Sequence, residues 1–449
     1  MKLHRITYFL FTLCLLACNK EKQPISVERS DYHAAMDVLT EVMIHDIFSP
    51  PVASRIYVYP NIAAYETLNS NPKNSTYHSL TGQLTNFEAL HLVPNSSEVN
   101  YNLAALIAYL DVAKELVFSG EMILHYRDSL YTNWEKINKS EFEYSKDYGL
   151  EVSKQVIDWM QKDAYAETRT MQDYNIFNNT PSAWKPTPPA YMKGIEPNWN
   201  KLRPFTLDSA SQFQPQAHPE FSMKPESLFY KELISVYNEV NRIREHGNES
   251  EEIAIARFWD CNPFVSVNKG HFMFAEKKIT PGAHWVGICK IAANLTEADL
   301  RKTVFAHTKT SIAIADAFIS CWDEKYRSNL VRPETLIVEF IDPDWTPILQ
   351  TPPFPEYTSG HSVVSSAAAE VLTDIFGDKF TFLDNTELPY GLPVREFQSF
   401  EHAASEAAIS RMYGGIHYQS AVYEGKIQGV AIGKWVNNQL EFIKKNNHL

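Results

Sequence analysis

The chain has 449 residues, of which 44% are hydrophobic, and this is enough to build a sizeable core. A formal net charge of −13 argues against nucleic-acid binding, which requires basic surface, although a local group of Lys and Arg could still bind a small anion. After the N-terminal segment the cysteines are Cys261, Cys289 and Cys321, an odd number at wide spacing that implies no disulfide framework.

The first element along the chain is a targeting segment. Lys2 and Arg5 supply positive charge, and the apolar run after them is too short to span a bilayer comfortably. It ends in Leu-Leu-Ala before Cys18, which resembles a bacterial lipoprotein signal. We therefore predict a signal peptide over residues 1–17 and a lipid on Cys18 that anchors the protein outside the cytoplasm, in the periplasm or at the outer membrane. An ordinary secretory peptide is the alternative.

Helical periodicity dominates the sequence that follows, with Ala, Leu and Glu recurring at intervals near 3.6 residues. Helices are predicted over Val27–His45, Val52–Leu68, Glu98–Phe118, Glu141–Asp163, Glu226–Arg244, His284–Ala293, Glu297–Asn329, Ser362–Phe376 and Glu401–Tyr413. Strand signals are few, and no alternation of strands with helices is evident. The sequence therefore predicts an all-α fold of packed helical bundles.

Residues 175–225 interrupt this pattern and are rich in Pro, Asn, Trp and Tyr. We interpret the segment as a long ordered connection that crosses the bundle. A lid over a site and an oligomer contact are the alternatives, because loops of this length are uncommon inside a compact domain. The sequence does not assign an oligomeric state.

Three short stretches in the C-terminal half carry the chemistry. They are Lys325-x6-Arg332-Pro333, Thr358-Ser359-Gly360-His361 and Ser410-Arg411-x5-His417. Together they supply three permanent cations, a hydroxyl, a backbone N–H without a side chain beside it, and two imidazoles. This set can hold a tetrahedral or trigonal-bipyramidal oxyanion and react it at one apex.

Local structure brings these groups to helix ends. Lys325 lies late in a predicted helix, and Pro333 disfavours helix at Arg332. Seven residues make about two helical turns, so both cations could face the same way. Arg411 lies near the end of another helix, and His417 begins the next one after a Gly-Gly turn. The alternatives are a solvated basic face for the cations and a structural role for the histidine.

The Thr-Ser-Gly-His stretch opens the helix predicted over Ser362–Phe376. A helix N-terminus exposes N–H groups and a partial positive charge, which suit an oxyanion. Gly360 lets the backbone approach the anion, and Ser359 offers a hydroxyl donor. Plain N-capping by Thr358 or Ser359 is the alternative, and it is compatible with anion binding.

The ordered set, from Trp322 to about Lys426, resembles the signature of the type 2 phosphatidic acid phosphatase and vanadium-dependent haloperoxidase superfamily. The runs 352–361 and 413–418 are similar to the haloperoxidase branch, and in particular to bacterial vanadium haloperoxidases, several of which are iodide-specific. The resemblance implies one haloperoxidase-like helical domain over residues 18–449, with a catalytic core at about 300–435.

The resemblance also implies a vanadate cofactor, with hydrogen peroxide and a halide as substrates, and its bacterial members point to iodide as the halide. Six residues would hold the vanadate: Lys325, Arg332, Ser359, Gly360, Arg411 and His417. His417 would bind the metal, Lys325 would help to polarise the bound peroxide, and His361 would take a proton from hydrogen peroxide. Three adjacent cations should keep His361 neutral.

Two aromatic residues bear on halide choice. Phe354 occupies a position where algal bromoperoxidases carry a histidine and fungal chloroperoxidases carry a phenylalanine, and Trp322 also has a counterpart in the family. Both could equally be core aromatics. Ala421 departs from the family pattern, because many members have an Asp there that orients the axial histidine. Another group must then orient His417.

Two other functions are compatible with the same residues. In an acid phosphatase of the same superfamily, His417 would be the nucleophile and His361 the leaving-group acid for phosphate monoesters. In a non-enzymatic envelope lipoprotein, the cage would survive as an oxyanion-binding site. In every case we expect no nucleic-acid partner and membrane attachment solely through the lipid on Cys18.

Overall fold

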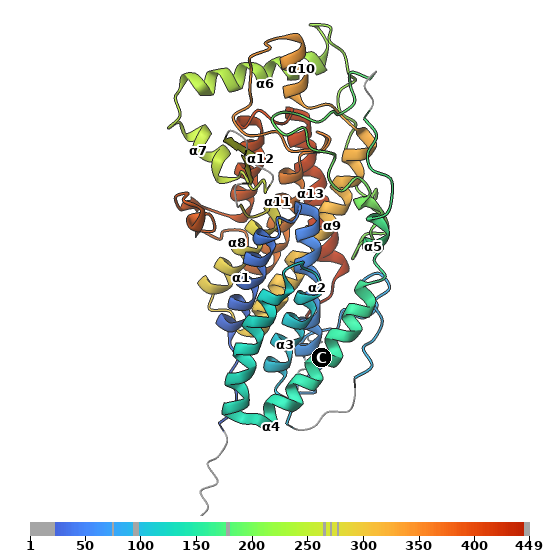
Figure 1. Cartoon of the computed structure of the whole chain (residues 1–449), viewed down its shortest axis with the longest axis vertical. Coiled ribbons are helices and arrows are strands. Elements are labelled where there is room, and N and C mark those ends of the chain that lie inside the picture. The colour runs from blue at the N-terminus through green and yellow to red at the C-terminus, as the bar shows by residue number, and fades with distance from the viewer. Residues whose placement is uncertain are drawn as a thin grey trace, which may run out of the picture.

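The computed structural model describes residues 23–73, 76–92, 98–176, 180–263, 266–269, 272–275 and 278–443. The predicted signal peptide and Cys18 lie outside these residues. Helices dominate the described chain, and this confirms the predicted all-α fold (Figure 1). Among the described residues, no helix combines the length and apolar character that crossing a membrane requires.

The N-terminal half contains a group of helices, most of which lie in the lower part of Figure 1. They are α1 (Arg29–His45), α2 (Pro50–Asn69), α3 (Tyr101–Lys114), α4 (Gly120–Met160) and the short α5 (Tyr165–Thr168). The backbone of Asn138 leaves helical geometry and divides α4 into two arms, which meet in a bend (Figure 1). The sequence predicted the second arm but not the first, which buries few side chains, among them Ile123 and Trp134.

The C-terminal half supplies the remaining helices. They are α6 (Leu228–Glu245), α7 (Glu251–Phe258), α8 (Pro281–Leu295), α9 (Leu300–Ser328), α10 (Pro333–Phe340), α11 (Gly360–Phe376), α12 (Phe400–Tyr413) and α13 (Gln419–Gln439), with 3-10 turns η1 (Trp199–Lys201) and η2 (Leu388–Tyr390). Two antiparallel hairpins complete the fold: β1 (Ser266–Lys269) with β2 (Phe272–Ala275), and β3 (Phe382–Asp384) with β4 (Arg395–Phe397). The last helix begins two residues later than predicted, after His417 rather than at it.

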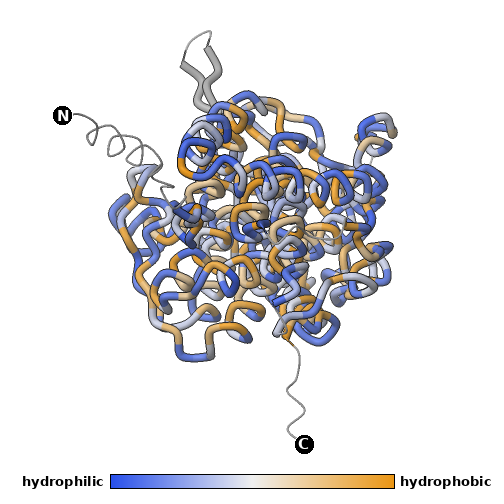
Figure 2. The backbone as a smooth tube through the Cα atoms, turned by 90° about the horizontal axis from the view of Figure 1, so that it is seen from below, coloured by the Kyte–Doolittle hydropathy of each residue, from blue (hydrophilic) through white to orange (hydrophobic). Residues whose placement is uncertain are grey.

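The core is built around α9, which is buried from Thr303 to Lys325 and packs against α2, α8, α11 and α13. One hydrophobic cluster runs from Ile25 to Phe442 and so includes both halves of the chain. Hydrophobic and hydrophilic residues intersperse along the helices, as expected where each helix buries one face (Figure 2).

Close packing of α13 on α11 sets the distance between two of the predicted motifs. A Cβ at Gly429 would lie 2.2 Å from the carbonyl oxygen of Val363, so the two backbones approach closely there. The backbone N–H of Ser359 donates to the carbonyl of Ala421 at 3.0 Å. These contacts bring the start of α11 beside the chain that follows His417.

The described part of the Pro-rich segment, residues 175–176 and 180–225, contains no α-helix. The N–H of Ile195 donates to the carbonyl of Pro353 at 3.0 Å, and the indole of Trp322 donates to the Ile195 carbonyl at 3.2 Å. Buried Asp316 of α9 accepts hydrogen bonds from the backbone of Phe205 and Thr206 at 2.7 and 2.8 Å. The segment therefore lies against the loop that precedes α11.

Candidate active site

The three predicted stretches meet at the C-terminal end of α9. That helix ends at Ser328, and the left-handed backbone of its C-cap residue Asn329 (φ 50°) turns the chain. Arg332 is extended before Pro333, as predicted, and α10 begins directly after it. The end of α12 and the Gly-Gly turn bring Arg411 and His417 to the same place.

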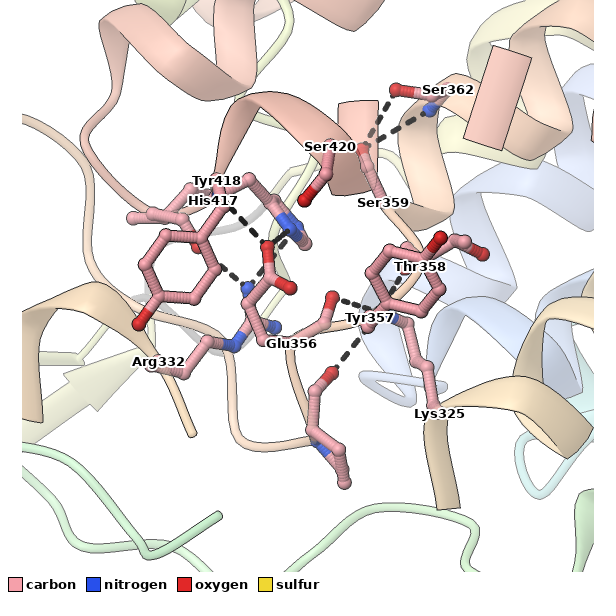
Figure 3. A network of polar contacts seen from close by, with 12 residues as sticks. Lys325, Arg332, Glu356, Tyr357, Thr358, Ser359, Ser362, His417, Tyr418 and Ser420 are labelled. Carbon is pink, nitrogen blue, oxygen red and sulfur yellow. Dashed lines mark hydrogen bonds and ion pairs between the residues drawn. The ribbon is translucent and has the colours of Figure 1, made fainter. Parts of the chain in front are cut away.

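His417 is oriented by Glu356, a residue to which the sequence assigned no role. Nδ1–H of His417 donates to Oε1 of Glu356 at 2.7 Å, and the N–H of Tyr418 donates to the same oxygen at 3.0 Å (Figure 3). On the other side of the ring, Nη1 of Arg332 donates to Nε2 of His417 at 3.1 Å. Because a guanidinium cannot accept a hydrogen bond, Nε2 carries the lone pair and is the ring atom that can bind a metal.

The electrostatic surroundings keep His417 neutral. Burial holds the pKa of His417 well below its usual range, and Arg332, Lys325 and Arg411 lower it further. Burial raises the pKa of Glu356 to about 7, while Arg332 and Lys325 oppose this rise. A neutral imidazole is the form that binds a metal ion.

Arg332 has one donor in reserve. Its Nε donates to the carbonyl of Phe354 at 3.0 Å and its Nη1 to the carbonyl of Ile416 at 2.8 Å. Nη2 is buried and has no hydrogen-bond partner among the described residues. A buried N–H without a partner is costly, so this donor is suited to an oxygen of a bound anion.

Lys325 anchors the loop before α11. Its ammonium donates to the carbonyls of Pro355, Glu356 and Thr358 at 3.1, 3.0 and 2.5 Å. Burial lowers the pKa of Lys325 to about 8, with a further contribution from Arg332. All three ammonium protons are therefore engaged by the backbone, and contact with an anion would require exchange of one of them.

Ser359 is the N-cap of α11. Its Oγ accepts from the N–H and the hydroxyl of Ser362 at 3.3 and 2.9 Å, so its own proton remains able to donate. Gly360 is the first helical residue, where a backbone N–H has no partner within the helix. A Cβ at Gly360 would lie 3.7 Å from the ring of Trp322, on the side of the cavity described below. The predicted capping and the predicted donors thus coexist.

His361 and Arg411 share the backbone of Trp259, a second residue without a sequence-based role. Nη2 of Arg411 donates to the Trp259 carbonyl at 2.8 Å, and the ring of His361 hydrogen-bonds to the same residue's backbone. Nε2 of His361 is buried without a partner among the described residues. Burial is the first cause of its depressed pKa, ahead of Arg411 and Lys325, so the predicted cations contribute second.

A cavity of about 30 Å³ lies among these groups. Its lining contains six predicted site residues, Trp322, Phe354, Gly360, His361, Arg411 and His417, together with Pro50, Cys261, Asn262, Pro281, Phe318, Pro352 and Ile416. Lys325, Arg332 and Ser359 are not among the lining residues. The space is large enough for a small ligand or ordered water.

Trp322 and Phe354 form one wall of the cavity. Their ring centroids are 4.9 Å apart. The ring of Phe354 also lies 5.0 Å from Nζ of Lys325 and 5.1 Å from the guanidinium carbon of Arg332. Both aromatics are therefore buried and also line the site, so the two alternatives drawn from sequence do not exclude each other.

Comparison with solved structures identifies the family. The crystal structure of the first bacterial vanadium-dependent iodoperoxidase is 55% identical in sequence, covers 95% of this chain and 100% of its own, and superposes with a TM-score of 0.91. The chain belongs to the vanadium-dependent haloperoxidases. Residues 338–445 also match the family described as the VCPO second helical-bundle domain. The resemblance seen in the motifs, and the enzyme class it implied, are thereby confirmed.

More distant haloperoxidases share the fold. Holo and apo structures of a bacterial vanadium-dependent chloroperoxidase are each 16% identical, with TM-scores of 0.62 and 0.65. They cover 90% and 92% of this chain and 92% and 98% of their own. No curated protein sequence matches the chain.

The residues present fit the vanadate that this family implies. The site offers one unprotonated imidazole nitrogen, Nε2 of His417, whose lone pair faces Nη1 of Arg332, and cationic or backbone donors around it. The unpartnered N–H of Arg332 is the clearest of these donors. An oxyanion with a metal centre satisfies both kinds of group at once, which a neutral ligand would not.

Proposed function

We propose that this haloperoxidase binds vanadate at His417 and oxidises iodide with hydrogen peroxide. The observation that carries the proposal is the state of His417, a neutral ring whose lone pair on Nε2 lies beside the guanidinium of Arg332. The relative that is 55% identical is an iodoperoxidase, and this supports iodide as the halide.

Each residue near the cavity would have a defined task. His417 would hold the vanadium, and Arg332, Arg411 and the N–H of Gly360 would bind its oxygens. Lys325 would fix the loop before α11 and supply positive charge. When bound, vanadate supplies a Lewis acid that polarises hydrogen peroxide, and the oxidation state of the vanadium does not change.

His361 would act as the general base. Its Nε2 is buried at the cavity without a partner, and its depressed pKa keeps it unprotonated near neutral pH. An unprotonated imidazole can accept a proton from hydrogen peroxide as the peroxide binds. The hydrogen bond between the other ring nitrogen and the Trp259 backbone would hold the ring in position.

The first test is halide oxidation by protein lacking residues 1–18, with hydrogen peroxide, with and without orthovanadate. Triiodide and tribromide absorbance would be followed, together with hydrolysis of p-nitrophenyl phosphate. We expect vanadate-dependent iodide oxidation with little bromide signal. Phosphate-ester hydrolysis that vanadate abolishes, without halide oxidation, would instead place the protein among the acid phosphatases.

The role of His361 gives a second test. Replacement by Ala should lower kcat for iodide oxidation by about 100-fold or more, as expected for loss of a general base, while vanadate still binds. His402→Ala, at an exposed histidine of α12, is the matched control and should leave the rate unchanged. Full activity in His361→Ala loaded with vanadate would show that this base is not needed.

We propose further that the mature protein is anchored to the cell envelope through a lipid on Cys18. The support is the short apolar run that ends in Ala before that cysteine. Cys18→Ser should move the protein from the membrane fraction to the soluble fraction and abolish labelling with a fatty acid. Cys14→Ser is the control and should change neither property.

A further inference from the structure

A buried cluster of metal-ligating side chains lies beside the active site and has no role in the proposed reaction. Cys261 follows α7, His284 lies in the first turns of α8, and Glu387 lies between β3 and η2. All three are buried, and their ligand atoms lie within 4.8 Å of one another. Cys261 also lines the active-site cavity.

The distances within the cluster match a metal coordination triangle. Nδ1 of His284 lies 3.4 Å from Sγ of Cys261 and 3.3 Å from Oε1 of Glu387, and Sγ lies 3.7 Å from that oxygen. The ligand atoms of a tetrahedral Zn²⁺ ion, with bonds of roughly 2.0–2.3 Å, lie roughly 3.3–3.8 Å from one another, and the three distances fall in this range. We propose that Cys261, His284 and Glu387 bind a divalent transition-metal ion, with Zn²⁺ as the best fit.

The surroundings of His284 support this assignment. Its Nε2 lies 2.9 Å from Oδ2 of buried Asp384, and Oδ1 of Asp384 accepts from the hydroxyl and the N–H of Thr386 at 2.7 and 3.0 Å. A metal-bound histidine typically donates its second ring N–H to a carboxylate that is itself hydrogen-bonded. Here Asp384 occupies that outer position and leaves Nδ1 directed at the other two ligands.

The chemistry of the donor set favours Zn²⁺. One thiolate, one imidazole and one carboxylate form a mixed set that suits this ion better than Mg²⁺ or Ca²⁺, which prefer oxygen. Three protein ligands leave the fourth tetrahedral position to water or another small ligand. The site is distinct from the vanadate site, which is centred on His417.

The ion would stiffen the backbone that supports the catalytic groups. Trp259 stacks on the ring of His284, with centroids 4.4 Å apart and planes at 16°. The carbonyl of Trp259 is also the acceptor for Arg411, and its backbone holds the ring of His361. Binding of Zn²⁺ would therefore link α8 and the chain after β3 to the segment that positions both active-site residues.

The same side chains could also form a hydrogen-bonded cluster without a metal ion. A protonated His284 would bridge Asp384 and Glu387 as an ion-paired imidazolium, with a neutral thiol on Cys261. Zinc binding would displace the protons of Nδ1 and the thiol. The metal-bound and metal-free arrangements predict different zinc contents, so measuring zinc per chain distinguishes them.

The test uses the full protein without vanadate, so its outcome is independent of halide oxidation. Metal is removed with dipicolinate, Zn²⁺ is added back, excess is dialysed away, and zinc per chain is measured by elemental mass spectrometry. We expect one zinc per chain and a Tm several degrees higher than that of the metal-free protein. Co²⁺ in place of Zn²⁺ should give the near-ultraviolet absorption of a cobalt–thiolate bond.

Variants locate the site. Cys261→Ser and Glu387→Gln should each weaken Zn²⁺ binding at least tenfold, and Asp384→Asn should weaken it about 10–100-fold as a supporting residue. Cys289→Ser, at a buried cysteine elsewhere in α8, is the matched control and should retain zinc. Absence of bound zinc with an unchanged Tm in the wild-type protein would overturn the proposal, even if a variant failed to fold. Equal zinc loss in Cys289→Ser would overturn it as well.

Discussion

At the scale of single residues, the state of His417 depends on a carboxylate 61 positions earlier in the chain. Oε1 of Glu356 accepts from both the His417 ring and the Tyr418 backbone, and its other oxygen, Oε2, is buried without a partner among the described residues. Burial disfavours the ionised form of Glu356, and the nearby charges of Arg332 and Lys325 favour it. The buried side chain of Glu356 thus sets the tautomer of His417, the proposed metal ligand. It takes the role of the Asp that many family members have at the position of Ala421.

Replacement of Glu356 tests this role directly. Glu356→Gln should lower vanadate affinity about 10–100-fold, because the amide is a weaker acceptor for Nδ1–H, and Glu356→Ala should lower it further. Affinity would be measured by titration of the metal-free protein with orthovanadate, with iodide oxidation as a second readout. Glu66→Gln, at another buried glutamate far along α2, should bind vanadate like the wild type. Unchanged affinity in both Glu356 variants would assign the orienting role elsewhere.

The sequence predicted a set of candidate site residues that the structure brings together, but it did not predict Glu356 and Trp259, which contact them. Lys325, Arg332 and Arg411 could be named because they belong to short motifs whose order along the chain resembles that of a known superfamily. Glu356 and Trp259 act through contacts made across long separations, which spacing does not reveal. An acidic residue inside an otherwise apolar run was the one available signal for Glu356, and its partner could not be named from it.

At the scale of elements, the start of α11 combines two functions in one residue. The Oγ of Ser359 caps the helix, and its proton can donate to an anion. Ser359→Ala should therefore cost about 1 kcal/mol of stability as an N-cap and also weaken vanadate binding. Ser227→Ala removes the cap of α6 and should cost similar stability with unchanged vanadate affinity. Equal vanadate affinity in the two variants would leave Ser359 with capping alone.

Element prediction succeeded where a segment is long and periodic. The central helix α9 and the helices α11 and α12 follow the predicted ranges to within a few residues. The short helices α7 and α10, of eight residues each, and the hairpins went unpredicted, because their stability comes from tertiary packing more than from local propensity. The first arm of α4 was missed because polar residues dominate it.

At the scale of the whole molecule, the N-terminal half and the site-bearing half share one interior. The helix α2 packs against α9, and the hydroxyl of Tyr65 and the N–H of His78 both donate to the carbonyl of Phe442. Composition predicted that a sizeable core exists, but the pairing of α2 with α9 depends on side chains some 250 residues apart. A buried group far from the catalytic cavity should therefore affect the free energy of unfolding of the whole protein.

Glu66 is such a group, and its effect on stability should depend on pH. It is buried near the end of α2 and accepts from the N–H of Leu80 and the hydroxyl of Ser79, both at 2.7 Å. Burial raises its pKa from an ordinary 4.5 to about 7, although these two hydrogen bonds oppose the rise. Between these two values the folded protein keeps a proton that the unfolded chain has lost.

Stability should therefore fall as pH rises through this window. The contribution of Glu66 is fully present below pH of about 4.5 and is lost as pH approaches 7, which amounts to about 3 kcal/mol. Tm measured from pH 5 to 8 should decline less steeply in Glu66→Gln than in the wild type. Glu88→Gln, at an exposed glutamate, should follow the wild-type curve. If Glu66→Gln followed it too, Glu66 would be ionised in the folded protein throughout this range, and its burial would be compensated by the loop that carries Ser79 and Leu80.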